Sequence, residues 1–336
     1  MKTIWFDITN VPHVNFLLPI INKYKDEYNF VFSLRDFAET KGLFQKKIPY
    51  PFLEIGKHEG GNKLNKVWGV VKRIFQLQKQ IPYFDLKVSV GGDASCIVSK
   101  MRGKKSITFD DNEKAPNWRY APFSDLAFWP KAIPAEVLKK QFFKKNLFQY
   151  NGYKEDMYLA DYTPDEHFTD MLPWKDYVVV RPENINANYV EGNNSIVPAL
   201  LKELKRLNKN VLFLPRYEFD RKYAEGFDNV FIPSGAINGL DACYYAEAVL
   251  TGAGTMAREA ACLGIPAVSF FAGKKLLTVD QSLIAEGKMF FSRDPKEIIE
   301  FLQKAEKGTL NIQRCKQVQA EILDKFEEFL KENNLK

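Results

Sequence analysis

Residues 249–266 combine a glycine turn with a carboxylate at helical spacing. They read Val-Leu-Thr-Gly-Ala-Gly-Thr-Met-Ala-Arg-Glu-Ala-Ala-Cys-Leu-Gly-Ile-Pro. The apolar residues up to Thr251 are typical of a buried parallel strand, residues 256–263 favour a helix, and the Gly-Ile-Pro that follows ends it. Between strand and helix, residues 252–255 form a turn whose unpaired N–H groups and positive helix dipole suit a phosphate.

Glu259 adds a second chemical group to this turn. It follows Thr255 by four residues, about one helical turn, whereas a capping box needs an acid three residues after the cap. We therefore expect the Glu259 carboxylate to look back over the turn and to accept hydrogen bonds from a ligand diol such as a ribose. The alternative is a plain strand–helix junction with a solvated Glu259.

Carboxylates also cluster after the strand predicted at residues 105–109. Asp110, Asp111 and Glu113 follow its carboxyl end, where open α/β sheets place their ligands. Repulsion among them should raise the pKa of at least one carboxyl group, which suits a general base. The adjacent aspartates also suggest a metal, although no histidine joins them.

His13 is a further candidate for proton transfer. It ends the loop 9–13 that follows a first buried strand at Thr3–Ile8. The ordinary pKa of histidine lies near neutrality, so His13 suits a general base or a hydrogen-bond donor, with a role in fixing the loop as the alternative. We expect the next helix at Val14–Tyr24, and Pro19 inside it indicates a kink or a delayed start.

Three more charged residues follow predicted strands. Asp93 comes after Gly91 and Gly92 at the end of a strand, where it suits either catalysis or the N-cap of the next helix. Arg181 and Arg216 end two strands in the second half of the chain. A guanidinium at such a position suits a diphosphate, and a surface ion pair is the alternative.

Strands and helices alternate along the whole chain, which predicts doubly wound parallel sheets. A chain of 336 residues is too long for one ordinary core and fits two domains of about 150 residues. The polar stretch 161–170, together with Pro164 and Pro173, is the predicted linker. We therefore expect Rossmann-like domains at residues 1–165 and 174–310.

Composition limits the class of protein. No run of about 18 apolar residues exists, so we expect no membrane span, and the chain enters a strand at once, so we expect no signal peptide. The four cysteines form no CxxC pair, which favours a reducing cytoplasm over zinc or disulfides. A net charge of +6 is too moderate and dispersed for a nucleic-acid binder, although it suits anionic ligands or lipid head groups.

Two basic segments are candidates for contact with the cytoplasmic face of a membrane. The first is an amphipathic helix expected to follow the polar loop 57–66, with Arg73 among the basic residues away from its apolar side. Most such helices only cover a sheet, and a minority bind anionic membranes. The second is residues 139–148, which interleave lysine and phenylalanine and which we predict as a surface helix with its aromatic side chains packed inward.

The string Gly-Ala-Gly-Thr-Met-Ala-Arg-Glu-Ala-Ala-Cys-Leu-Gly-Ile-Pro-Ala resembles the nucleotide-sugar motif of two-domain GT-B proteins. It looks most like a family of predicted glycosyltransferases. It is more distantly similar to the UDP-N-acetylglucosamine 2-epimerases and to the N-acetylglucosaminyl transferase that makes the peptidoglycan lipid intermediate. The resemblance implies that Gly252, Ala253, Gly254 and Thr255 bind phosphate and that Glu259 binds ribose. Residue 253 is alanine where the family pattern has glycine.

The same resemblance gives roles in the first domain. Asn10-Val11-Pro12-His13 is similar to an Asn-x-Pro-His signature in a loop that faces the cleft between GT-B domains. Asp111 and Glu113 fit an Asp-x-Glu-x-Ala pattern. Asp93 matches a Gly-Asp position that is implicated in catalysis in the epimerases.

In the second domain the resemblance implies two further contacts. The nucleotide base is held by backbone near Ile232, and Asp280 touches sugar hydroxyls. The helix at 311–336 is expected to return toward the first domain, as GT-B helices often do. No metal and no separate cofactor are implied, because the nucleotide sugar is itself the donor substrate.

The implied function is a glycosyltransferase that moves a sugar from a nucleotide donor, expected to be UDP-linked, to a glycan or glycolipid acceptor in polysaccharide synthesis. A nucleotide-sugar 2-epimerase, hydrolysing or not, is the alternative. It would use Asp93, Asp111 or Glu113 as acid and base. A non-catalytic nucleotide-sugar-binding protein is the third interpretation.

Overall fold

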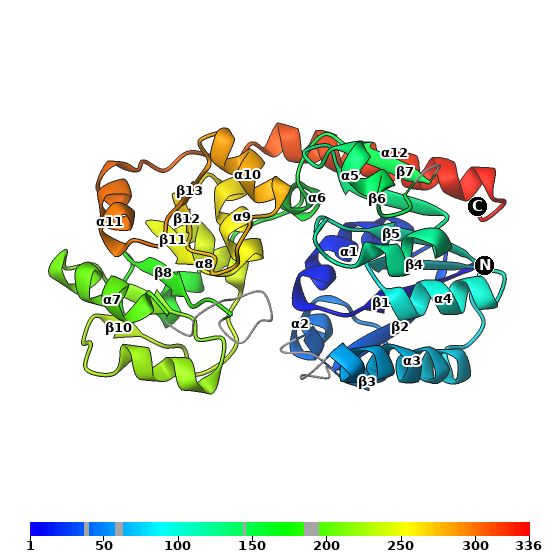
Figure 1. The fold of residues 1–336 in the computed structure, drawn as a ribbon, viewed down its shortest axis with the longest axis horizontal. Helices are drawn as coiled ribbons and strands as arrows, with labels where there is room; N and C mark the ends of the chain where they lie inside the picture. Colours follow the sequence, from blue (N-terminus) through cyan, green and yellow to red (C-terminus); the bar gives the residue numbers. More distant parts are fainter. Residues whose placement is uncertain (37–39, 58–62, 144–145, 185–194) are drawn as a thin grey trace. The chain divides into compact units, whose positions relative to one another are not determined.

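Two parallel β-sheets organise the chain in a computed structural model that describes residues 1–36, 40–57, 63–143, 146–184 and 195–336 (Figure 1). One compact unit consists of Met1–Asp161 together with Gln313–Lys336, and the other is Tyr162–Ile312. Each sheet is flanked by helices and has a doubly wound strand order. The predicted fold class, two Rossmann-like parallel-sheet domains, is confirmed.

The first unit has seven parallel strands in the order β3-β2-β1-β4-β5-β6-β7. The strands are β1 (Thr3–Ile8), β2 (Asn29–Asp36), β3 (Leu53–Lys57), β4 (Leu86–Val90), β5 (Lys105–Phe109), β6 (Leu126–Pro130) and β7 (Leu147–Tyr150). The helices are α1 (Val11–Tyr24), α2 (Thr40–Lys47), α3 (Lys63–Gln80), α4 (Asp93–Met101), α5 (Ala135–Lys139), α6 (Lys154–Leu159) and α12 (Ile312–Glu332). The central strand β1 is buried on both faces, as near-continuous apolar strands of parallel sheets are.

The chain leaves β1 in one direction to form β2 and β3, then returns past β1 to form β4. Because β-α-β crossovers are right-handed, this reversal puts α1 and α2 on one face of the sheet and α3 and α4 on the other. The contacts agree, since α1 packs against α2 and α3 against α4. Helix α12 joins the face of α1, where the rings of Tyr24 and Phe326 lie 5.4 Å apart.

The second unit has six parallel strands in the order β10-β9-β8-β11-β12-β13. The strands are β8 (Val178–Arg181), β9 (Val211–Phe213), β10 (Val230–Phe231), β11 (Ala248–Thr251), β12 (Ala267–Ser269) and β13 (Met289–Phe291). The helices are α7 (Val197–Arg206), α8 (Gly239–Tyr245), α9 (Gly254–Leu263), α10 (Thr278–Ala285) and α11 (Pro295–Lys304). The valines of β8 and leucines of α7 share one apolar core with Leu250 of β11.

Two local predictions are wrong. Helix α1 begins at Val11 rather than Val14, because the Asn10 side chain caps it by accepting a hydrogen bond from the Val11 N–H at 2.9 Å and proline is favoured in a first turn. The helix then runs through Pro19, so its start is not delayed.

Residues 139–148 are not one surface helix. Helix α5 ends at Lys139, a turn follows, and residues 147–150 form the edge strand β7. Phe143 is fully buried while Phe142 is 54% exposed. Within the described ranges, each helix is either too short or too polar to cross a bilayer.

Candidate functional site

The second sheet reverses its winding between β8 and β11, and open α/β sheets bind ligands outside the carboxyl ends of such strands. Arg181 and Thr251, the last residues of these strands, are direct neighbours in the sheet. The strand order also places Arg216 after β9 and Ile232 after β10. With neighbouring strands about 4.8 Å apart, these ends form a row along one edge of the sheet.

The turn from β11 to α9 is shaped by the chain itself. Thr251 Oγ1 accepts a hydrogen bond from the Ala253 N–H at 2.9 Å. A Cβ atom on Gly252 would lie 2.5 Å from the Cα of Glu183, so the glycine is needed for the close passage of the 182–183 segment. A Cβ on Gly254 would meet only the end of the Arg258 side chain, at 3.1 Å. At residue 252 the glycine therefore lets the turn pack closely against another segment of the same chain.

Helix α9 begins at Gly254 and is capped by backbone alone, since Ala253 has no side-chain oxygen. Its first turn also holds no acidic residue. The positive end of the helix dipole is therefore not neutralised by the side chains of that turn. This agrees with an anion site at Gly252–Thr255, which remains a prediction.

A buried ion pair lies beside the first turn of α9. Arg258 Nη1 and Asp280 Oδ1 are 2.9 Å apart, and both side chains are buried. Arg258 Nη2 also donates to Thr255 Oγ1 at 3.4 Å. Asp280 thus lies near the predicted phosphate-binding turn, where it forms an ion pair with Arg258. Sequence reasoning assigned Arg258 no role, although its place three residues after Thr255 puts it on the same face of the helix.

Glu259 is 8% exposed, so the alternative of a solvated side chain is wrong. Burial raises the pKa of the Cys243 thiol in α8 well above its ordinary value; the negative Glu259 raises it further and the positive Arg181 lowers it. The charges of Glu259 and Arg181 therefore both lie near Cys243. The role of Glu259 in ribose binding stays a prediction.

Arg216 and Ile232 complete the row of strand ends. The Arg216 N–H donates to Asp220 Oδ2 at 2.8 Å, which fixes the backbone after β9. The Ile232 side chain packs against the apolar core, so only its backbone is a candidate for contact with a nucleotide base. Neither role is tested by the geometry alone.

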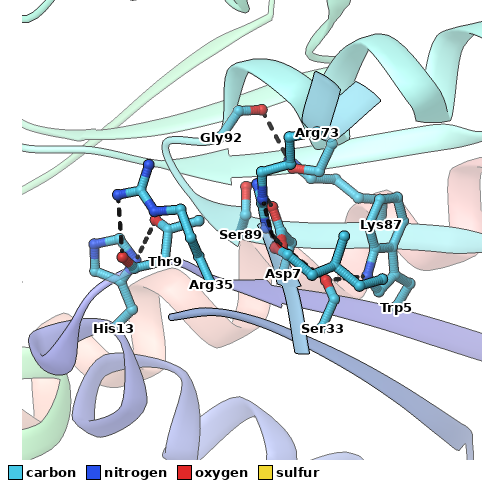
Figure 2. Close-up of polar contacts among 12 residues, drawn as sticks. Trp5, Asp7, Thr9, His13, Ser33, Arg35, Arg73, Lys87, Ser89 and Gly92 are labelled. Atoms are coloured by element: carbon cyan, nitrogen blue, oxygen red, sulfur yellow. Dashed lines mark hydrogen bonds and ion pairs between the residues drawn. The ribbon is translucent and has the colours of Figure 1, made fainter. Parts of the chain in front are cut away.

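The first sheet reverses its winding between β1 and β4, and the predicted catalytic residues follow these strands and β5. A network of buried polar and charged side chains surrounds Asp7 on β1. The Arg73 guanidinium reaches both carboxylate oxygens of Asp7, at 2.5 and 3.1 Å, and Ser33 Oγ donates to Asp7 at 2.7 Å (Figure 2). Although burial opposes it, this pairing lowers the pKa of Asp7 to about 2. Arg73 is therefore not a surface cation of α3, although its position in the sequence predicts that it is one.

His13 lies in the first turn of α1, next to Thr9 and Arg35 (Figure 2). Its Nδ1 is 3.4 Å from Thr9 Oγ1, and Arg35 Nη2 donates to the Thr9 carbonyl at 3.3 Å. Burial, together with the Lys154 ammonium, lowers the pKa of His13 to about 3, while Asp111 partly opposes the shift. A neutral imidazole with so low a pKa is a weak general base at neutral pH.

In the acidic cluster, the structure favours Asp110 as the general base, whereas the sequence favours Asp111 and Glu113. Burial and the neighbouring Asp111 raise the pKa of Asp110 to about 6. Asp110 accepts hydrogen bonds from the Tyr120 hydroxyl at 2.7 Å and from the Asp111 N–H at 2.8 Å. Asp110 is only half-buried, so its carboxyl group is partly accessible to solvent, and its pKa lies near neutrality. Sequence reasoning included Asp110 in the cluster but preferred its neighbours.

Asp111 is paired instead with Lys154, the first residue of α6. Lys154 Nζ and Asp111 Oδ2 are 2.8 Å apart, with both side chains buried. Nothing in the sequence singles out Lys154, because Lys-Glu-Asp at 154–156 resembles an exposed helix start. Glu113 is also buried, and its carbonyl accepts a hydrogen bond from Gln141 Nε2 at 2.5 Å.

Asp93 is not the N-cap of α4, so that alternative is wrong. Gly92, with φ +108°, holds the cap position and offers no side chain, and Asp93 is the first helical residue. Asp93 Oδ2 lies 3.6 Å from Arg119 Nη1. Burial raises the pKa of Asp93, and Arg119 opposes the shift. In the ranges that the structure describes, no group of three or more His, Cys, Asp or Glu residues is placed to hold a metal ion.

Solved structures of three enzymes are similar to this chain in fold. The UDP-GlcNAc 2-epimerase of Methanocaldococcus jannaschii, in complex with UDP-GlcNAc and UDP, has a TM-score of 0.69 at 15% identity and covers 98% of this chain and 100% of its own. The UDP-N-acetylglucosamine 2-epimerase of Rickettsia bellii has a TM-score of 0.74 at 15% identity, covering 99% and 98%. The glycotransferase of kitacinnamycin has a TM-score of 0.61 at 10% identity, covering 99% of both chains. These likenesses confirm the GT-B type of fold.

A curated relative is much more similar in sequence. The uncharacterized protein MJ0665 of Methanocaldococcus jannaschii is 30% identical over 318 residues, which cover 89% of this chain and 90% of the relative. The family model described as "Protein of unknown function (DUF354)" matches residues 2–331. With nearly the whole chain matched, this protein belongs to the DUF354 family.

Proposed function

We propose that this protein is a glycosyltransferase that moves a sugar from a UDP-linked donor to a glycan or glycolipid acceptor in the synthesis of a cell-surface polysaccharide or glycolipid. The observation that carries the proposal is the edge of the second sheet, where α9 begins with no acidic residue in its first turn, directly after the strand that neighbours the strand of Arg181. The binding of UDP-GlcNAc and UDP by a protein of the same fold supports this choice of ligand.

In this proposal the second unit holds the donor. The backbone N–H groups of residues 252–255 bind the diphosphate, with Arg181 and Arg216 adding positive charge. The leaving nucleoside diphosphate gains negative charge as the sugar departs, and fixed dipoles and cations stabilise it. Glu259 would bind the ribose and the Ile232 backbone the base.

Asp280 takes a positioning role in place of direct contact with sugar hydroxyls. Its ion pair holds the Arg258 guanidinium beside Thr255 and the start of α9. A cation fixed there adds to the potential of the helix terminus. Removal of Asp280 should therefore weaken diphosphate binding even though Asp280 itself carries a negative charge.

The first unit would supply the general base that takes a proton from the acceptor. A transferase must take a proton from the attacking hydroxyl, and the best base has a pKa near the working pH. Asp110 meets this condition, so we add it to the predicted candidates His13, Asp111 and Glu113. The neutral His13 would donate or accept a hydrogen bond, and Lys154 would hold the charge of Asp111 in place.

An epimerase is the second candidate, because two of the structural relatives described above are UDP-GlcNAc 2-epimerases. In that reaction Asp93, Asp111 or Glu113 would exchange the proton at the sugar carbon. A protein that only binds nucleotide sugars is the third candidate.

One experiment separates the three. A thermal-shift screen against nucleoside diphosphates and their sugars identifies the ligand, since a ligand at 100 times its Kd stabilises the protein by about 2.7 kcal/mol. Proton NMR then follows that donor with and without lipid and glycan acceptors. A transferase consumes the donor rapidly only with an acceptor, an epimerase converts it alone, and a binding protein leaves it unchanged. The absence of stabilisation by every nucleotide would refute all three.

A further inference from the structure

Helix α3 carries an exposed stripe of alternating aromatic and basic side chains. Trp68 and Phe75 are each 70% exposed, and Lys72 and Lys79 are exposed as well. At 100° per residue these four positions fall within about 60° of one another around the helix axis. We call these four residues the α3 stripe.

The stripe is not needed to attach the helix to the sheet. On the inner side of α3, Leu77 is fully buried in an apolar cluster, with Ile74 packed against it. Arg73 anchors the same side through Asp7 and through the Ile55 carbonyl, to which its Nε donates at 3.1 Å. A helix that only covers a sheet normally turns polar residues outward, so two outward aromatic residues need another explanation.

The charge of this surface has one sign. Residues 63–80 include lysine and arginine but neither aspartate nor glutamate. Just beyond the helix, Tyr83 is 65% exposed and Lys104 Nζ lies 4.2 Å from the centre of its ring. Asp85, two residues after Tyr83, accepts a hydrogen bond from the Tyr83 hydroxyl at 2.7 Å. A surface that combines aromatic rings with several cations and almost no anions complements an anionic bilayer.

We propose that the α3 stripe binds the surface of an anionic membrane. Trp68 and Phe75 enter the interfacial region, and Lys72 and Lys79 meet lipid phosphates with their ammonium groups. Binding of this kind is peripheral and reversible, and it is independent of the function proposed above. If that function holds, membrane binding brings the first unit to a lipid-linked acceptor.

Vesicle binding by the full chain tests the proposal. Co-flotation with vesicles of phosphatidylcholine and phosphatidylglycerol should far exceed that with phosphatidylcholine alone. Lys72→Gln with Lys79→Gln should lower the partition coefficient about 30-fold, since each cation near such a surface contributes about 1 kcal/mol. The matched control is Lys25→Gln with Lys316→Gln, which removes the same charge from exposed positions of the same unit and should change partitioning less than about 2-fold.

A spectroscopic readout locates the contact. Vesicles should shift the tryptophan emission of the wild type to the blue, and Trp68→Phe should abolish most of this shift while retaining binding. Equal partitioning on neutral and anionic vesicles, or an equal loss in the Lys25 and Lys316 control, would overturn the proposal. So would equally tight binding of duplex DNA at the same phosphate concentration, because the surface would then recognise any polyanion.

Discussion

His13 offers a quantitative test of the site in the first unit. Its pKa is lowered from 6.5 to about 3 by burial and by the ammonium of Lys154. Below pH 6.5 the unfolded chain therefore binds a proton that the folded chain does not, so the free energy of unfolding falls as the pH falls. Between about pH 7.5 and pH 5.5 this one group should reduce it by about 1.4 kcal/mol.

The size of the effect is set by the unfolded state. At pH 5.5 a folded imidazole with a pKa of about 3 is neutral, so the ordinary pKa in the unfolded chain determines the expected loss. Other groups also titrate in this range, and His13→Asn isolates the contribution of His13 because asparagine does not titrate. The wild type should lose about 1.4 kcal/mol more than the variant between the two pH values.

Urea unfolding followed by tryptophan fluorescence suits the measurement, because Trp5, Trp68, Trp118 and Trp129 lie in the first unit and only Trp174 lies in the second. In proton NMR, the His13 ring signal, identified by its loss in the variant, should not titrate above about pH 5. Equal pH dependence in both proteins would refute the assignment of a buried neutral imidazole. A wild type that gains stability at pH 5.5 would show instead that His13 is protonated beside Asp111, and the case for His13 as a base would return.

Three other predictions follow from single contacts. Asp110→Asn should lower turnover of the true substrate by about 10²–10⁴-fold and remove the fall in kcat/KM below pH 6, while donor affinity stays within about 2-fold; unchanged turnover would exclude Asp110 as the base. Gly252→Ala should lower the stability of the second unit by about 1–3 kcal/mol in thermal melting without ligand, because the new Cβ would lie 2.5 Å from Glu183 Cα. Gly254→Ala is its control and should cost clearly less, and equal costs would contradict the close passage at Gly252. Asp7→Asn should cost about 3–5 kcal/mol in urea unfolding, since it leaves a buried guanidinium without its charge partner, and a loss below about 1 kcal/mol would show that the pair is not buried.

Much of the architecture could be predicted because it depends on local patterns. Alternating apolar strands and amphipathic helices specify parallel sheets, and parallel strands bring the residues that follow them to one edge. For that reason His13, Asp93 and Asp111 could be placed at the first sheet and Arg181 at the second without coordinates. The predicted start of α1 is wrong because the Asn10 side chain caps the helix. The proline that the sequence suggests as part of a loop therefore lies in the first turn of the helix.

The partners of charged residues could not be predicted in this way. Arg73 has the spacing of an exposed cation, yet it reaches Asp7 on a strand that lies 66 residues earlier in the chain. Asp110 and Asp111 are adjacent and chemically identical, and their partners distinguish them: the Lys154 ammonium for Asp111 and the Tyr120 hydroxyl for Asp110. Such pairings depend on which helix packs beside which strand in the folded protein. The periodicity of the sequence does not specify that packing.

Calorimetric titration with UDP tests the central claim, a nucleotide site at the start of α9, most directly. The wild type should bind UDP. Glu259→Ala should weaken binding by about 1.5–3 kcal/mol, roughly 10- to 150-fold, because a hydrogen bond to a charged group is lost. Asp110→Asn, in the other unit, should leave the affinity unchanged. A wild type that does not bind UDP, or a folded Glu259→Ala protein that binds it as tightly as the wild type, would contradict the account.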